Sequence, residues 1–329
     1  MYRHKVKALT CGVLAGVCAV AAHAQSIKTQ IPFAQSPAGI AANSVTNRIY
    51  VAAPSYGGAT DSITVINGGT DSISAQIPVP VGAQYPAVDI IRNRILVAGC
   101  NLYSENFSCI VTLIQGGTNK VLKTATITTT EGDGILGVAF DPILNKLYIA
   151  NGSDLRIDVV DGASLRLEGS ISTSGQEPFG LSFNPTNHRL YAVYYSNTVD
   201  TFDTYNRNLL ATTTVGSRNV ADAVNWVTGN VFVTDNVFGP STTSVLDKNG
   251  NVLASVPVSE TPYGVDVDPI TNKAFVVSTG IPALSVISGS TNTVLATLQG
   301  VSANYVAVNF ASEKVYLSGN SGVIVVTEK

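Results

Sequence analysis

Residues 138–150 read Val-Ala-Phe-Asp-Pro-Ile-Leu-Asn-Lys-Leu-Tyr-Ile-Ala, two short apolar runs on either side of a polar turn. β-Prone residues fill both runs, and Asp-Pro-x-x-Asn between them is typical of a tight turn. Related stretches occupy residues 40–52, 181–193 and 265–277. We therefore interpret residues 138–150 as a hairpin of two strands that repeats along the chain.

The repeat can be counted by the aromatic residue of its second strand, or the residue that replaces it. This position falls at Tyr50, Leu96, Tyr148, Tyr191, Phe232, Phe275 and Tyr316. Two further apolar runs follow each of the first six positions, so that a repeat holds four short antiparallel strands, here A to D. A period of about 40 to 50 residues with four strands is the signature of a β-propeller blade. The sequence predicts an all-β fold, a seven-bladed β-propeller of four-stranded antiparallel blades.

The two ends of the chain indicate how the ring closes. The seventh repeat ends at Lys329, directly after its third strand. Residues 26–32, Ser-Ile-Lys-Thr-Gln-Ile-Pro, resemble the fourth strands at residues 121–126 and 252–257. We expect the N-terminal strand to complete the last blade, which would leave no unpaired edge at the junction.

Three short motifs give a family resemblance. They are Pro-x-Gly-[Ile/Val], as in residues 262–265, Asp/Asn-Pro-x-Thr-Asn, shortened to Asn-Pro-Thr-Asn in residues 184–187, and Asn-[Lys/Arg]-[Leu/Ile]-Tyr-Val, as in residues 47–51. Together they resemble the YVTN-type β-propeller repeat, over essentially all of the chain after residue 24. This resemblance implies a secreted seven-bladed propeller. Related propellers include lactonases and virginiamycin B lyases, which use acidic or histidine residues around the axis, and the fold alone does not choose among these functions.

The first 24 residues predict a secretory signal peptide. Arg3, Lys5 and Lys7 form a basic start, residues 8–22 are apolar, and Ala-His-Ala at 22–24 is a small-x-small cleavage site. The apolar run is too short to span a membrane as a helix. We expect residues 25–329 to form a single propeller domain, secreted or periplasmic, with no membrane span.

Charge and composition limit the classes of partner that the chain can be expected to bind. Loss of the three basic residues of the signal peptide would change the formal net charge from −3 to −6, and only 12% of residues are charged. An acidic chain without a basic run is a poor partner for nucleic acid or anionic membranes. We expect a monomer that binds no nucleic acid.

Only two cysteines follow the signal peptide, Cys100 and Cys109. Their separation suits a disulfide between two strands, and export would permit one. The alternative is two free thiols. A metal pair is disfavoured because His188 is the single histidine after residue 24.

Loop lengths distinguish the turns expected to be structural from the loops expected to carry function. The A–B and C–D turns keep nearly the same length in every repeat, whereas the B–C loops of blades one, two and five and the D–A crossing at residues 126–137 vary. All the variable segments belong to one face of an antiparallel propeller, here the upper face. Residues in the invariant turns are interpreted as structural, with short side chains that bond the backbone: Asp141, Asn184, Asn225, Asp268 and Asn309 in A–B turns, and Asp161, Asp203 and Asp247 in C–D turns.

Two sets of residues on the upper face are candidates for a site. The first is aromatic and would give flat, amphipathic contacts, unless its members pack against neighbouring loops: Tyr56, Tyr85, Tyr103, Phe107, Tyr194, Tyr195, Phe238, Tyr263 and Tyr305. The second is polar and belongs to the D–A crossings near the axis: Asp133, Glu177, Arg218, Asn219, Asp222, Glu260 and Asn304. The polar set could hold a divalent cation, calcium or magnesium, by oxygen ligands. Alternatively, these residues could bind a polar small molecule, or they could be ordinary solvated residues of the loops.

Three functions remain open, and no cofactor is identified. The first is a binding or interaction module whose upper face engages a polysaccharide, a peptide or another exported protein. The second is a metal-dependent enzyme at the central channel, a lactonase-like hydrolase or a lyase. The third is a structural protein of the cell envelope. The binding module leads, because the chain has no Gly-x-Ser-x-Gly, no His-Glu-x-x-His and no phosphate-binding glycine loop.

Overall fold

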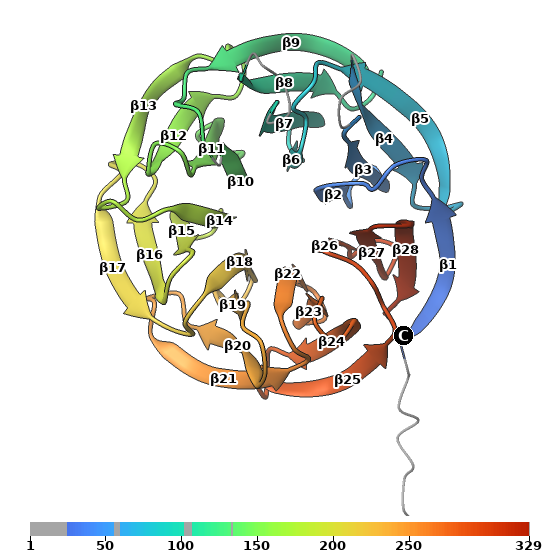
Figure 1. Cartoon of the computed structure of the whole chain (residues 1–329), viewed down its shortest axis with the longest axis vertical. Helices are drawn as coiled ribbons and strands as arrows, with labels where there is room; N and C mark the ends of the chain where they lie inside the picture. The colour runs from blue at the N-terminus through green and yellow to red at the C-terminus, as the bar shows by residue number, and fades with distance from the viewer. Residues whose placement is uncertain (1–24, 56–59, 102–106, 133, 329) are drawn as a thin grey trace, which may run out of the picture.

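The structure is a computed structural model that describes residues 25–55, 60–101, 107–132 and 134–328. Its strands form seven four-stranded antiparallel sheets arranged as blades around a central axis (Figure 1). No helix occurs among the described residues. The predicted all-β, seven-bladed propeller is confirmed.

The blades run in chain order, and each places its A strand innermost (Figure 1). The A strands are β2 (Ile40–Asn43), β6 (Tyr85–Asp89), β10 (Ile135–Asp141), β14 (Pro178–Asn184), β18 (Asn219–Val224), β22 (Pro262–Asp268) and β26 (Tyr305–Asn309). The B strands are β3 (Arg48–Ala53), β7 (Arg94–Cys100), β11 (Lys146–Asn151), β15 (Arg189–Tyr194), β19 (Val231–Asp235), β23 (Lys273–Ser278) and β27 (Lys314–Gly319). The C strands are β4 (Asp61–Asn67), β8 (Cys109–Gln115), β12 (Arg156–Asp161), β16 (Thr198–Asp203), β20 (Ser241–Leu246), β24 (Ala283–Ser288) and β28 (Gly322–Thr327). The outermost D strands are β5 (Ser72–Val79), β9 (Lys120–Ile127), β13 (Leu167–Ser172), β17 (Leu209–Thr214), β21 (Val252–Val258), β25 (Thr293–Gln299) and, for blade seven, β1 (Ser26–Pro32).

The ring closes as the sequence predicts. β1 pairs antiparallel with β28, from Ser26 opposite Thr327 to Pro32 opposite Gly322. This supplies blade seven with its fourth strand from the other end of the chain (Figure 1). The edge of β28 is therefore covered.

The core lies between neighbouring blades. The aromatic residues in the B strands, which mark the repeat in the sequence, are completely or almost completely buried. Tyr50, Tyr148 and Phe275 are 0 to 1% exposed. One buried cluster joins Tyr148 of blade three to Leu190 of blade four, so each aromatic ring fills the space between two sheets. A large apolar side chain at this position is needed because adjacent blades share no backbone ladder and are held together by packing.

The A–B turns have a common construction. In six blades the Asp or Asn that opens the turn accepts a backbone N–H two or three residues later, as Asp141 does from Ile143 at 2.8 Å. The residue four positions after it has a positive φ in all seven blades: Asn47, Asn93, Asn145, His188, Gly229, Asn272 and Glu313. Asn and Gly suit this left-handed conformation because it costs them least. The interpretation of these turns as structural is confirmed for Asp141, Asn184, Asn225 and Asp268. The expectation is wrong for Asn309, whose Oδ1 has no partner among the described residues and whose backbone carbonyl accepts the Ser312 N–H at 3.1 Å instead.

Candidate functional site

The strongest candidate site is a pocket at the upper end of the central channel. Its volume is about 160 Å³, and its wall contains residues from the first half of all seven A strands. These strands surround the axis (Figure 1). A ligand bound there would therefore be held by a rigid frame from every blade.

One position of the repeat forms a continuous band in this wall. It lies three residues before the Asn or Asp that opens each A–B turn, and it is occupied by Ile40, Pro86, Val138, Leu181, Asp222, Val265 and Val306. Six of the seven residues are apolar. Blade five alone places a carboxyl group there, so Asp222 is the one acidic residue in an otherwise apolar ring.

Asp222 is held close to the neighbouring blade. Its side chain is 9% exposed, and its Oδ2 accepts a short hydrogen bond from the Ser182 hydroxyl on β14. Its Oδ1 makes no hydrogen bond within the described part of the chain. Burial raises the pKa of the Asp222 carboxyl to about 7, although the hydrogen bond from Ser182 opposes the shift. An ionised Asp222 therefore lacks a charged partner in this structure.

Three tyrosines line the same pocket at the start of the A strands. Tyr305 lies between the other two, with its ring centroid 6.4 Å from that of Tyr85 and 5.8 Å from that of Tyr263. The interplanar angles are 74° and 88°, so both pairs meet edge to face. Burial raises the pKa of Tyr305 well above its ordinary value, and the two neighbouring tyrosines add to this shift. The hydroxyls of Tyr263 and Tyr305, whose pKa values burial raises, are neutral at any ordinary pH.

A second aromatic group continues the rim on the opposite side. Phe179 lines the pocket and stacks on Tyr195, with ring centroids 5.5 Å apart and an interplanar angle of 23°. The guanidinium carbon of Arg218 lies 4.4 Å from the centroid of the Tyr195 ring. The Tyr195 side chain is 40% exposed. Phe179, Tyr195 and Arg218 thus form a layered group between the pocket and solvent, held by stacking and a cation–π contact.

The remaining aromatic candidates have different positions. The expectation of an exposed Tyr194 is wrong: its ring is completely buried in the core between blades, and its hydroxyl donates to Asp200 Oδ2 at 2.7 Å. The reason is strand alternation, since Tyr194 ends β15 pointing inward and Tyr195 is the first residue to emerge. Phe107 is half-buried against the core of blades two and three, while Phe238 is 81% exposed in the B–C loop of blade five. Tyr56 and Tyr103 lie outside the described residues.

The polar candidates do not gather as a group. Asp222 lines the pocket, whereas Asn219 is buried beside it and donates its amide to the Val215 carbonyl at 3.1 Å. Glu260 accepts the Gly239 N–H at 2.7 Å. Glu177 and Asn304 are partly exposed beside the rim, and Asp133 lies outside the described residues. Where the chain is described, no group of three or more His, Cys, Asp or Glu side chains is placed to hold a metal ion.

Sequence reasoning missed Phe179, Leu136 and Val220, which line the pocket beside the tyrosines. A signal for Phe179 was present in the motif Pro-x-Gly, because Phe179 occupies the same middle position as Tyr263. The start of each A strand lies closer to the axis than any B–C loop does, so its side chains reach the channel first.

The charges of the two faces differ. In the B–C loops and D–A crossings above the pocket, the described acidic residues are Glu131, Asp154, Glu177 and Glu260, and the described basic residue is Arg218. Most lysines and arginines belong to the opposite ends of the strands, as Arg48, Lys146 and Lys273 do at the first residue of their B strands. The upper face therefore presents an excess of negative charge around the pocket.

The lower face, formed by the A–B and C–D turns, carries an apolar rim that the sequence interpretation treated only as scaffold. Large hydrophobic side chains are exposed there at Val45, Ile90, Ile91, Ile143, Trp226, Val227 and Ile270, at 37 to 70%. They occupy the A–B turns of five blades. A second pocket of about 180 Å³ opens among some of them, with Asp266 in its wall.

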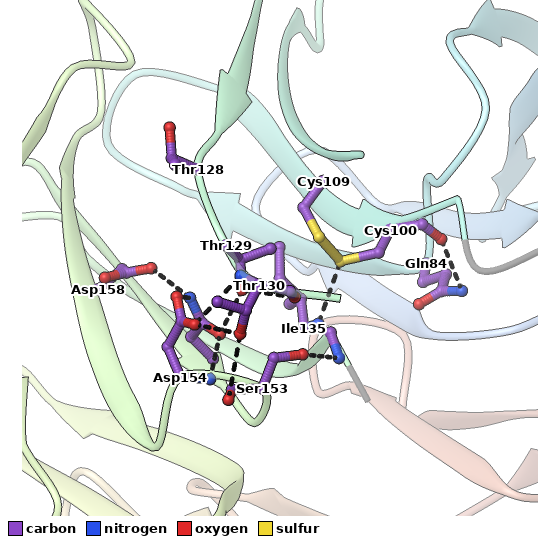
Figure 2. Close-up of a disulfide and its surroundings, with 12 residues drawn as sticks. Gln84, Cys100, Cys109, Thr128, Thr129, Thr130, Ile135, Ser153, Asp154 and Asp158 are labelled. Atoms are coloured by element: carbon purple, nitrogen blue, oxygen red, sulfur yellow. Dashed lines mark hydrogen bonds between the residues drawn. A yellow bond between two sulfur atoms is a disulfide. The ribbon is translucent and has the colours of Figure 1, made fainter. Parts of the chain in front are cut away.

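The predicted disulfide is present between Cys100 and Cys109 (Figure 2). It joins the last residue of β7 to the first residue of β8, directly opposite in the ladder. The Ile135 N–H lies 3.2 Å from Cys100 Sγ, where the crossing enters blade three. In the same crossing, Asp154 accepts the Thr130 backbone N–H at 3.1 Å. The disulfide thus braces both the B–C loop of blade two and the crossing beside it.

No protein-family model matches this chain, and no curated protein matches it. In the described residues there is no helix long and apolar enough to cross a membrane. We therefore infer the function from the geometry of the pocket, its aromatic rim and the charges around it.

Proposed function

We propose that the protein is an exported binding module of the YVTN propeller type that engages its ligand with the upper face, at the mouth of the central channel. One observation carries the proposal: the upper pocket combines aromatic side chains from four blades, Tyr85, Phe179, Tyr263 and Tyr305, around one point. Rigid aromatic groups give large contact area at little cost in conformational entropy, which is characteristic of recognition surfaces.

The scaffold supports binding because it fixes the pocket before a ligand arrives. The side chains that line it come from A strands, which pair in every blade with B strands whose central residues are buried. A preorganised pocket loses less freedom on binding than a loop-built one. The Phe179–Tyr195–Arg218 group extends this fixed surface outward, so that a ligand larger than the pocket would have a second area to contact.

Export is supported by the expected signal peptide and by the disulfide. The signal peptide expected at residues 1–24 would direct the chain out of the cytoplasm. The disulfide between Cys100 and Cys109 is compatible with an oxidising compartment, where such bonds persist.

A second candidate, a hydrolase or lyase acting at the channel, is favoured by one feature. Asp222 combines burial in a pocket with a pKa of about 7, which suits a general acid or base near neutral pH. The chemistry would then begin with proton transfer at the Asp222 carboxyl. Binding without turnover, measured by following a bound ligand for chemical change, separates the two candidates.

The proposed binding is tested by probing a glycan array and a displayed peptide library with the folded chain from residue 25. Tyr263→Ala should weaken each genuine hit by tenfold or more, because truncation of a central aromatic contact typically costs above about 1 kcal/mol. Tyr205→Ala is the matched control, since Tyr205 is 62% exposed in a C–D turn on the lower face. Equal affinity of wild type and Tyr263→Ala for every hit would contradict the proposal.

A further inference from the structure

The upper pocket has a size that suits a small organic group. Its volume of about 160 Å³ is close to the roughly 150 Å³ of an apolar cavity that holds benzene. An ion such as Ca²⁺ would fill little of it, and it prefers six to eight oxygen ligands. The wall offers aliphatic side chains, three tyrosine rings and Phe179, together with polar backbone and hydroxyl groups. The pocket therefore fits a group with an apolar surface.

The same wall favours a positive charge on that group. The faces of aromatic rings are negative, and a weakly hydrated cation such as an alkylammonium is attracted to them. Tyr305 meets Tyr85 and Tyr263 edge to face, at 74° and 88°, so the three rings that line the pocket are turned in different directions. A nearly perpendicular arrangement of this kind lets several rings contact one rounded ligand group.

Asp222 supplies the matching negative charge. Its carboxyl is nine-tenths buried in the pocket wall, and its Oδ1 has no hydrogen-bond partner within the described residues. An isolated carboxylate in an apolar ring is costly unless a cation pairs with it. The four described acidic residues in the loops and crossings of the upper face, against one basic residue, would draw a cation toward the channel mouth.

We propose that the upper channel pocket binds an organic ammonium group, with Asp222 as its counter-charge and the rings of Tyr85, Tyr263 and Tyr305 against its alkyl surface. The group is either a small amine or the amino end of a longer ligand that continues along Phe179 and Tyr195. This inference rests on the proposed binding function and names the class of ligand for the same site.

The test is calorimetric titration of the folded chain from residue 25 at pH 8 with three probes. Choline and tetramethylammonium carry the charge, and 3,3-dimethyl-1-butanol is the uncharged analogue of choline with the same shape. Both cations should bind, and the neutral alcohol should bind at least tenfold more weakly. Equal binding of choline and the alcohol would overturn the proposal, as would the absence of binding by both cations.

Variants assign the binding to the named residues. Asp222→Asn should weaken choline at least tenfold, and Tyr305→Leu should do the same, whereas Tyr305→Phe keeps the ring and should stay within threefold of wild type. Asp266→Asn is the matched control, because Asp266 is also an acidic A-strand residue, accepts the Val308 N–H at 2.7 Å and lines the lower pocket instead of the upper one. A loss in Asp266→Asn equal to that in Asp222→Asn would overturn the assignment. Thermal melts of each variant establish that it is folded.

The outcomes also separate this inference from the proposed function. If array or library hits depend on Tyr263 but choline neither binds nor competes with them, the ligand class is wrong and the binding face stands. If choline binds but no hit depends on Tyr263, the pocket assignment stands and the broader upper-face function fails. Competition of choline with a Tyr263-dependent hit supports both.

Discussion

The Asn309 side-chain amide donates a hydrogen bond of 2.7 Å to Asn47 Oδ1, and this bond joins blade seven to blade one across 262 positions of sequence. Asn225 donates in the same way to Asn272, at 2.7 Å, in the next blade. In each pair the donor opens one A–B turn and the acceptor is the left-handed residue of the following turn. A turn that opens with Asn thus links two blades where the next turn supplies an Asn as the acceptor.

The first prediction uses this link. Asn309→Asp should lower the free energy of unfolding by about 1–3 kcal/mol, because it removes the donor and places a carboxylate against Asn47 Oδ1. The measurement is urea-induced unfolding followed by circular dichroism.

Asn184→Asp is the matched control for that link. The Asn184 Nδ2 has no hydrogen-bond partner among the described residues, and the corresponding residue of the next blade is Gly229. Its Oδ1, which accepts the Thr186 N–H at 2.9 Å, would remain. A loss of stability as large in Asn184→Asp as in Asn309→Asp would show that the amide link does not matter.

The second prediction concerns Asp71, which fastens the closing blade. Its carboxylate accepts from Lys314 Nζ at 2.8 Å and from the Tyr316 hydroxyl at 2.7 Å. Asp71→Ala would leave the largely buried Lys314 ammonium without its partner, so we expect a loss of about 3 kcal/mol in unfolding free energy. Lys28→Ala removes the exposed third partner and should change stability little. Equal losses in the two variants would contradict this account.

The third prediction concerns ring closure by β1. A chain that begins at Phe33 lacks the strand that covers β28. It should melt at a markedly lower temperature and aggregate through the exposed edge, because an unpaired strand offers free N–H and C=O groups. Differential scanning calorimetry with light scattering compares it with a chain that begins at Ser26. Identical melting of the two chains would show that β1 does not close the ring.

The fourth prediction concerns the disulfide. Replacing both Cys100 and Cys109 with alanine removes the constraint on the intervening loop, and loop-closure entropy puts the loss at about 2–3 kcal/mol. Both residues are buried in an apolar cluster, so alanine avoids burial of a hydroxyl. Reducing agent should lower the melting temperature of wild type and leave that of the double variant unchanged. Insensitivity of the wild type would mean that the bond contributes nothing.

The fifth prediction concerns pH and Glu328, which is 4% exposed at the lower face. Burial, reinforced by Asp268, raises the pKa of its carboxyl to about 8. Between the ordinary value near 4.5 and 8, the unfolded chain has released this proton and the folded chain retains it, so stability falls as pH rises through that window. Burial also raises the pKa values of Asp222 and Asp266, to about 7 and about 6, and these add in the same direction.

Glu328→Gln isolates that contribution. Glutamine does not titrate, so the variant should lose less stability than wild type between pH 5 and pH 8 in denaturant titrations at fixed salt. A wild-type curve no steeper than that of Glu328→Gln would disprove the role of this carboxyl.

The sequence by itself determined the architecture, because the repeat is local. Each copy carries its own strand alternation, its own turn residues and its own large apolar residue that packs between blades. Asp141 illustrates the turn, since its side chain accepts a backbone N–H as expected for Asp at this position. The terminal strand and the disulfide were also predictable, the first from its likeness to other D strands and the second from two isolated cysteines.

The pocket was decided by tertiary structure. Tyr194 and Tyr195 are neighbours in sequence, yet one is buried between blades and the other lies at the rim, because strand alternation directs them to opposite sides. Asp222 is unremarkable in its own strand and becomes distinctive only when seven strands bring the equivalent positions into one apolar ring. Convergence on an axis combines residues from the whole length of the chain, and for that reason the repeat could be read locally whereas the site could not.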